Sequence, residues 1–183
     1  MYHIFDSDNY EEYGVSRDPD LPDGISFLTG KIIEESLAEP LEFFVDNPLD
    51  IPLADFTELV IPVMSNKLVT LLKNAGIDNL QIFRALLHNP DTGQNWTNYQ
   101  AVNIIGTIAC ADMEQSKYID AGGAGIILVH FEKLVVNCKK THGALLFRLA
   151  ESPDKILIHE KVMGEILRHE PKMKVLFKPV NLS

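Results

Sequence analysis

The most constraining feature of the chain is a pair of long strand-like runs joined by a short turn signal. Residues Leu80 to His88 and Asn95 to Ala109 are rich in β-branched, aromatic and other apolar side chains, which favour strands. Between them, Asn89-Pro90-Asp91-Thr92-Gly93 places proline and glycine where a hairpin turn needs them. The sequence therefore predicts an antiparallel hairpin, and the rest of the fold has to be built around it.

Two segments have the apolar periodicity of helices. Residues 65–76 carry apolar side chains at helical spacing, with Ser65 as the N-cap and Gly76 just past the end. A second helix is predicted from Glu160 to His169, where Pro171 stops it. Further strand-like runs follow the hairpin at residues 126–136, 145–149, 156–159 and 174–180. This order of elements predicts an α+β fold, with a mainly antiparallel sheet and two or so packed helices.

Residues 1–60 differ from the rest in composition. They hold 15 Asp or Glu residues and only two basic ones, in a chain whose net charge is -10. The stretch from Asp6 to Gly24 lacks helical or strand periodicity, and short edge strands and turns are expected around the apolar fragments Ile25–Leu28 and Leu41–Val45. We expect an irregular acidic segment over 1–60 and an α+β core over 61–183, folded together as one domain.

The acidic segment constrains the class of partner. An anionic surface repels nucleic acid and membranes, and it attracts basic proteins or cations. A calcium loop is disfavoured, because the acids from Asp18 to Gly24 lack the bidentate Glu that ends such a loop. A purely solvated face remains an open alternative to partner binding. If a basic protein binds there, its candidate contacts are Asp18, Asp20, Asp23, Glu34, Glu35, Glu39 and Glu42.

No motif in the sequence predicts catalysis, a cofactor or a metal. The glycines of Ala121–Gly125 open onto an apolar strand instead of a helix, so they predict an inter-strand turn and not a phosphate loop. His130 and Glu132 align on one face of a strand, but no pair of histidines has the spacing of metal ligands on a helix. The alternative function is a small ligand-binding domain or an enzyme, with a site assembled from dispersed His, Glu and Tyr residues.

The cysteines and the N-terminus bear on the compartment. Cys110 and Cys138 lie in apolar surroundings without metal-binding spacing, so two buried reduced thiols are expected. The first residues lack the basic and apolar regions of a signal peptide, and no apolar run approaches the length of a membrane span. These features predict a cytoplasmic protein.

Three segments carry a resemblance to a known family. They are Ile61-Pro62-Val63-Met64-Ser65 with the helix up to Gln81, Tyr99 to Gly106 followed by Asp112 and Ser116-Lys117-Tyr118, and Leu146 to Ser152 with the strand and helix up to Leu167. In this order and spacing they resemble the eleventh immunity-protein family of bacterial polymorphic-toxin systems. The resemblance covers roughly residues 30–180.

This resemblance implies a non-enzymatic antitoxin that binds a cognate secreted toxin and neutralises it by occlusion. It brings no catalytic residues. Together with the charge, it predicts a basic toxin such as a nuclease as the partner, and it leaves a homo-oligomer open. Within the third segment, Arg148 is a candidate to pair with a buried carboxylate.

Overall fold

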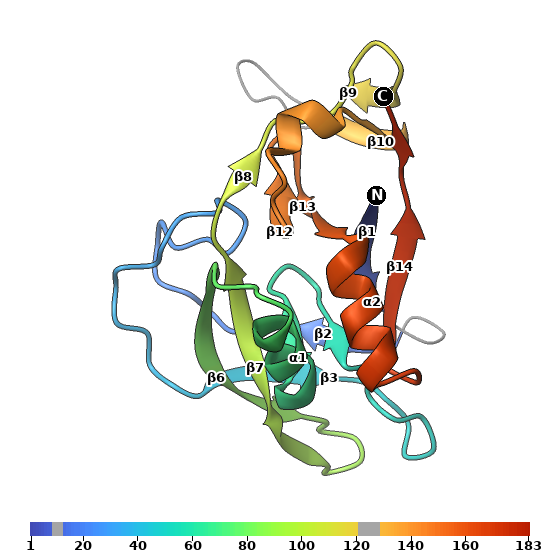
Figure 1. Cartoon of the computed structure of the whole chain (residues 1–183). Coiled ribbons are helices and arrows are strands. Elements are labelled where there is room, and N and C mark those ends of the chain that lie inside the picture. The colour runs from blue at the N-terminus through green and yellow to red at the C-terminus, as the bar shows by residue number, and fades with distance from the viewer. Residues whose placement is uncertain (9–12, 121–128) are drawn as a thin grey trace.

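Two β-sheets and two helices build the fold, as the computed structural model of residues 1–8, 13–120 and 129–183 shows (Figure 1). The six-stranded sheet has the order β2-β3-β6-β7-β5-β4, formed by Val15–Arg17, Leu41–Val45, Leu80–His88, Asn95–Ile104, Val63–Ser65 and Phe56–Thr57. The five-stranded sheet has the order β14-β1-β13-β12-β8, formed by Val175–Pro179, Tyr2–Ser7, Ser152–His159, Leu146–Leu149 and Thr107–Ile108.

Two smaller strand pairs complete the described elements. They are β9 (Lys117–Asp120) with β10 (Val129–Lys133), and β11 (Val135–Val136) with β15 (Asn181–Leu182). A short 3-10 helix follows β11 at Cys138–Thr141. Within the described ranges the parallel neighbours are β3 with β6, β8 with β12 and β11 with β15, and the other pairs are antiparallel. The α+β class with antiparallel-rich sheets is therefore confirmed.

The predicted hairpin is present as β6 and β7, which pair antiparallel from Leu80 opposite Ile104 to His88 opposite Asn95. In the turn, Oδ1 of Asn89 accepts hydrogen bonds from the backbone N–H groups of Asp91 and Thr92, each at 3.0 Å. The second strand was expected to continue to Ala109, and this is wrong because the chain leaves the sheet at Gly106. Gly106 has a φ of +103°, which favours glycine, and the following residues join the other sheet as β8.

Both predicted helices form where the sequence places them. Helix α1 is Asn66–Asn74 and helix α2 is Glu160–His169. The hydroxyl oxygen of Ser65 accepts a hydrogen bond from the N–H of Leu68 at 3.2 Å, which satisfies a donor left free at the start of α1. Gly76 follows α1 with a φ of +93°. Across the part of the chain that the structure describes, neither helix has the length and apolar character that a bilayer crossing requires.

Strand β1, which the sequence analysis did not predict, lies inside the five-stranded sheet. It pairs antiparallel with both β13 and β14, so the N-terminal strand lies beside the C-terminal one (Figure 1). Its side chains serve two cores, because Phe5 points into the main core and Tyr2 into a smaller one. The first residues of the chain are therefore integral to a sheet that is otherwise built from residues after 106.

The described part of residues 8–60 runs mainly as loops across the six-stranded sheet. Phe27, Ile33 and Leu53 are buried against the face of this sheet that points away from α1. Ile25–Leu28 is turn and loop instead of an edge strand. Leu41–Val45 does form β3, but as an interior strand between β2 and β6, because its alternate residues pack into this core. The turn at Ile25–Leu28 fits the expectation of short edge strands and turns, and the edge position expected for Leu41–Val45 is wrong.

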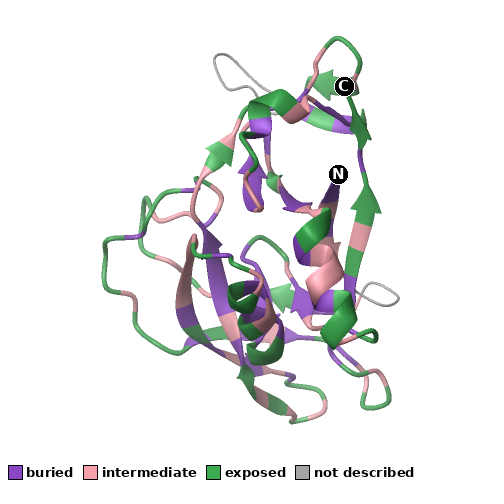
Figure 2. Cartoon of the chain, in the orientation of Figure 1, coloured by how far each residue is buried: buried purple, intermediate pink, exposed green. Residues whose placement is uncertain are grey.

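The main core lies between the two sheets and takes side chains from both helices. Leu68 and Leu72 of α1 and Val162 and Ile166 of α2 have no exposed surface there. Figure 2 shows the opposite faces of both helices as exposed. A third core, with Phe147 at its centre, lies on the other face of the five-stranded sheet near β10. The predicted glycine-rich turn at 121–125 falls outside the described residues.

Candidate functional site

The seven acidic residues suggested by the sequence lie on the N-terminal loops and on β3, and they fall into two groups. Five have exposed side chains that form no hydrogen bond or ion pair with another described residue: Asp20, Asp23, Glu34, Glu35 and Glu42. The other two are tied into the fold. The structure thus separates carboxylates that are available to a partner from carboxylates that hold the loops in place.

Asp18 and Glu39 are the two carboxylates with structural contacts. Oδ2 of Asp18 accepts a hydrogen bond from the N–H of Val60 at 3.0 Å, and burial raises the pKa of this carboxyl above its ordinary value. Glu39 accepts a hydrogen bond from the N–H of Arg84 at 2.5 Å and lies 3.6 Å from its Nε. Neutralising either residue would disturb a loop as well as remove a charge.

The loop that carries Glu34 and Glu35 is held against the hairpin by side chains of β6 and β7. The amide group of Gln81 accepts from the N–H of Ile33 at 2.9 Å and donates to its carbonyl at 2.8 Å. Asn103 Nδ2 donates to the carbonyl of Lys31 at 2.8 Å. These paired contacts fix the backbone while the two acidic side chains remain in solvent. The loop is therefore an ordered platform for exposed charge.

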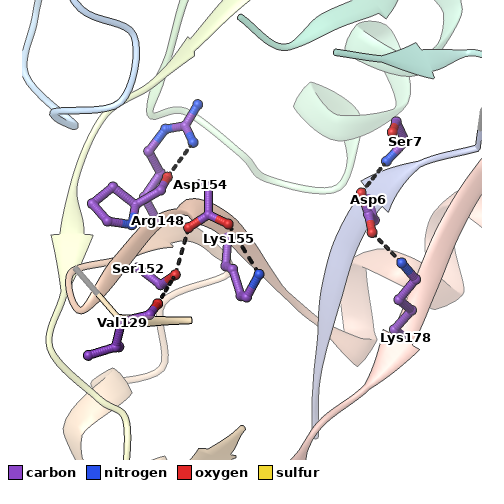
Figure 3. Close-up of polar contacts among 9 residues, drawn as sticks. Asp6, Ser7, Val129, Arg148, Ser152, Asp154, Lys155 and Lys178 are labelled. Carbon is purple, nitrogen blue, oxygen red and sulfur yellow. Dashed lines mark hydrogen bonds and ion pairs between the residues drawn. The ribbon is translucent and has the colours of Figure 1, made fainter. Parts of the chain in front are cut away.

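A polar cluster lies at the seam between the two sheets, with Arg148 of β12 at its centre (Figure 3). Arg148 is fully buried, and its Nη1 donates to the carbonyl oxygen of Pro153 at 2.6 Å. Its Nε and Nη2 are buried without a hydrogen-bond partner among the described residues. Burial lowers the pKa of Arg148, and the nearby carboxylate of Glu58 acts against that change. The expected carboxylate is thus present as an electrostatic neighbour and not as a direct ion pair.

A cavity of about 260 Å³ lies at the same seam. The carboxylates that line it are Asp6, Glu58 and Asp154. Asp6 pairs with Lys178, and Asp154 pairs with Lys155 at 3.1 Å (Figure 3). Glu58 forms no hydrogen bond or ion pair with a described residue, and burial raises the pKa of Glu58 to about 8.

The chemistry available in this cavity is narrow. Its described lining holds no Ser, Thr, Cys or His side chain, and its titratable side chains are three carboxyl groups and the amine of Lys155. Its volume is below the roughly 300 Å³ at which small-molecule sites begin. A carboxyl group with a raised pKa in a cavity is a functional-site candidate in general, but buried charge networks produce the same effect. We interpret Glu58 as part of such a network.

The dispersed His, Glu and Tyr residues do not gather into a second site within the described chain. His130 and Glu132 are both exposed on β10, and Glu132 pairs with Lys117 of the neighbouring strand. No group of three His, Cys, Asp or Glu residues in the described ranges is close enough to hold a metal ion. Tyr99 is buried, and its hydroxyl donates to the carbonyl of Ala54 at 2.9 Å. The hydroxyl group of Tyr99 therefore stabilises the fold and is not available as a site residue.

No sequence pattern marks Glu58, which is an isolated carboxylate between a short strand and a loop. Its environment arises only when β1, β4 and β13 meet, and these elements are far apart along the chain. Arg148 was noticed within an apolar run, where a single charged residue indicates a buried partner.

Comparison with known proteins gives one informative match. The model of the Imm11 immunity protein family matches residues 7–180, which is nearly the whole chain. A comparison with curated proteins finds no match. The family match extends the resemblance, which covered roughly residues 30–180, to the acidic loops from residue 7 onward.

Proposed function

The chain belongs to the Imm11 immunity protein family, and from this premise we propose that it binds a cognate secreted toxin and occludes the surface with which the toxin acts. The proposed partner is a basic toxin, such as a nuclease, that reaches the cytoplasm. Both cysteines are free thiols, which suits that reducing compartment.

The observation that supports a basic partner is the placement of the unpaired acidic residues. The chain has a net charge of -10, and its first 60 residues contain 15 carboxylates. Four of them, Asp20, Asp23, Glu34 and Glu35, are exposed on anchored loops and have no partner among the described residues. Fixed charge of one sign steers an oppositely charged protein and raises its association rate.

We further propose that neutralisation is stoichiometric and requires no enzymatic step, cofactor or metal. The family match supports this proposal, and no group of three His, Cys, Asp or Glu residues in the described ranges could hold a metal ion. When the immunity protein is added stepwise to a fixed amount of toxin, the toxin's activity should be abolished at a constant molar ratio, whatever the incubation time. Inactivation that continues with time at substoichiometric immunity protein would instead indicate catalysis.

The charge proposal is tested by neutralising only the exposed loop acids. In the quadruple variant Asp20→Asn, Asp23→Asn, Glu34→Gln and Glu35→Gln, the association rate with the cognate toxin should fall about tenfold or more at low salt. The difference from wild type should shrink at high salt, because ions screen exposed charges. Stopped-flow measurements at two salt concentrations provide the rates.

The matched control removes four exposed carboxylates elsewhere. The variant Asp50→Asn, Asp78→Asn, Asp91→Asn and Glu114→Gln changes the net charge equally and should slow association much less. Equal effects of both variants would show that only overall charge matters. Unchanged rates in the first variant would leave the loop acids as a solvated face, and the toxin would have to bind another surface.

A further inference from the structure

The six-stranded sheet extends beyond the helix that covers it. Helix α1 packs on the ends of β6 and β7 that carry Ile82, Val102 and Ile104. Toward the turn at Asn89 to Gly93, the same face has no covering element among the described residues, and Figure 1 shows the hairpin continuing past α1. The side chains there come from alternate positions of β3, β6 and β7, because successive residues of a strand point to opposite faces.

Two adjoining hollows form a groove on this uncovered face. One has a volume of about 430 Å³ and the other about 230 Å³, and Leu86 lines both. Phe44 lies in the smaller hollow, and neither it nor Leu86 belongs to any of the three cores. Both side chains are only partly buried, although they lie on central strands of the sheet. The middle of the groove is therefore apolar and unfilled.

Each hollow also contains an acceptor without a donor. Gln100 lines the larger hollow, and its Oε1 is buried without a hydrogen-bond partner. Glu42 lines the smaller hollow as an exposed carboxylate that has no ion pair with a described residue. A buried amide that lacks a partner costs stability in the free protein, so its retention points to a donor supplied from outside.

The other charged and polar side chains around the groove have contacts within the described chain. Arg84 pairs with Glu39, and the guanidinium of Arg17 lies 3.7 Å from the centre of the Phe44 ring. His88 Nδ1 is 2.7 Å from Oδ1 of Asn95. Of the Asp, Glu, Lys and Arg side chains that line the two hollows, Glu42 is the one without an ion pair among the described residues, so the hollows favour a cationic or N–H-donating group from their occupant.

We propose that this groove is the docking surface for the toxin, and that it receives an apolar side chain on Leu86 with a basic or amide donor on each side. The inference rests on the proposed function and adds the location and chemistry of the contact. In this arrangement the negative net charge of the chain attracts the basic toxin, and the groove holds it once bound.

Gln100→Leu gives the sharpest test, because it should change stability and affinity in opposite directions. Removing a buried unpaired amide should raise the melting temperature of the free protein. The same change should weaken binding of the cognate toxin by about tenfold, because a donor of the toxin then loses its acceptor. A residue with a purely structural role would not link higher stability to weaker binding.

Leu86→Arg and Glu42→Lys test the apolar centre and the carboxylate. We expect each to raise the dissociation constant, by about 30-fold or more for Leu86→Arg. The matched controls Leu49→Arg and Asp50→Lys, at exposed positions outside the groove, should stay within about twofold of wild type. If Leu86→Arg fails to fold, Gln100→Leu and Glu42→Lys still decide the question.

The outcomes separate this inference from the proposed function. Wild-type affinity in Gln100→Leu, Glu42→Lys and Leu86→Arg would overturn the groove and leave toxin binding intact. A wild-type chain that does not bind the toxin would overturn both. Sedimentation that shows a dimer, dissociated by Leu86→Arg, would assign the groove to a second copy of this chain and overturn the toxin assignment.

Discussion

Glu58 illustrates how a single side chain takes its character from distant elements. The groups that act on its charge are Arg148 of β12, Asp6 of β1, Asp154 of β13, and Asp18, which follows β2. Desolvation is the largest effect, and it raises the pKa from 4.5 to about 8 although Arg148 acts in the opposite direction. The folded chain therefore holds a proton that the unfolded chain releases near pH 4.5.

The contribution of Glu58 to stability is therefore predicted to fall as the pH rises, whereas carboxyl groups with a lowered pKa contribute more as the pH rises. Because the pKa of Glu58 is raised on folding, its stabilising contribution is complete below pH 4.5 and is lost as the pH rises to about 8. The limiting slope is about 1.4 kcal/mol per pH unit, and solvent in the cavity should keep the measured slope below it. Glu58→Gln should be more stable than wild type at pH 8, with a difference that narrows toward pH 5.

Urea unfolding of both proteins at pH 5.5, 7 and 8.5 measures this difference. The exposed residue Glu35 supplies the control, since Glu35→Gln should follow the wild-type curve throughout. A constant difference between Glu58→Gln and wild type across the pH range would show that Glu58 has the same pKa in the folded and unfolded chains.

At the scale of elements, the contact between Gly30 and Gly106 joins the acidic loop to the crossing between the sheets. The N–H of Gly106 donates to the carbonyl of Gly30 at 2.8 Å, where β7 ends and the chain turns toward β8. A Cβ added at Gly30 would lie 2.8 Å from Cγ2 of Thr107 and 3.0 Å from the carbonyl carbon of Gly106. Gly30 also has a positive φ of +66°. Close approach and backbone conformation both require glycine here.

Gly30→Ala should therefore destabilise the protein by more than backbone strain alone. Strain from a positive φ costs about 1–2 kcal/mol for alanine, and the steric clash adds to it. Gly24→Ala is the matched control, because Gly24 has a φ of +83° but no atom within 4 Å of an added Cβ. Chemical denaturation should show the larger loss for Gly30→Ala. Equal losses would mean that the loop moves aside without cost.

The elements that the sequence predicts correctly are those whose signals are local. The β6–β7 hairpin, the Ser65 cap and both helices depend on residues within a few positions of each other. Strand β1 depends on pairing with β13, about 150 residues away along the chain. The end of β7 at Gly106 depends on a contact with Gly30, about 75 residues away. No local sequence pattern encodes either partner. The same limit applies to the candidate site, because nothing in the sequence distinguishes Asp18 and Glu39, which hold loops, from the exposed acids around them.

At the scale of the whole molecule, we propose that residues 1–60 and 61–183 unfold as one cooperative unit. The boundary that composition suggests at residue 60 is crossed by the five-stranded sheet, in which β1 lies between β13 and β14. It is also crossed by the main core, which contains both Phe5 and Phe56. Neither segment completes a sheet and a core without the other.

A chain that starts at residue 61 should therefore lack a cooperative unfolding transition. It loses β1 from the interior of one sheet, and it loses β2, β3 and β4 from the other.

Deleting only residues 1–7 should have nearly the same effect, because Phe5 is about 1% exposed and the backbone groups of β13 and β14 would lose their partner. Deleting 181–183, which removes the exposed strand β15, should leave a cooperative transition. Near-ultraviolet circular dichroism and urea titration of the three truncations provide the comparison. If the chain from residue 61 keeps a native spectrum and a sharp transition, the acidic segment is an appendage to a core that folds without it.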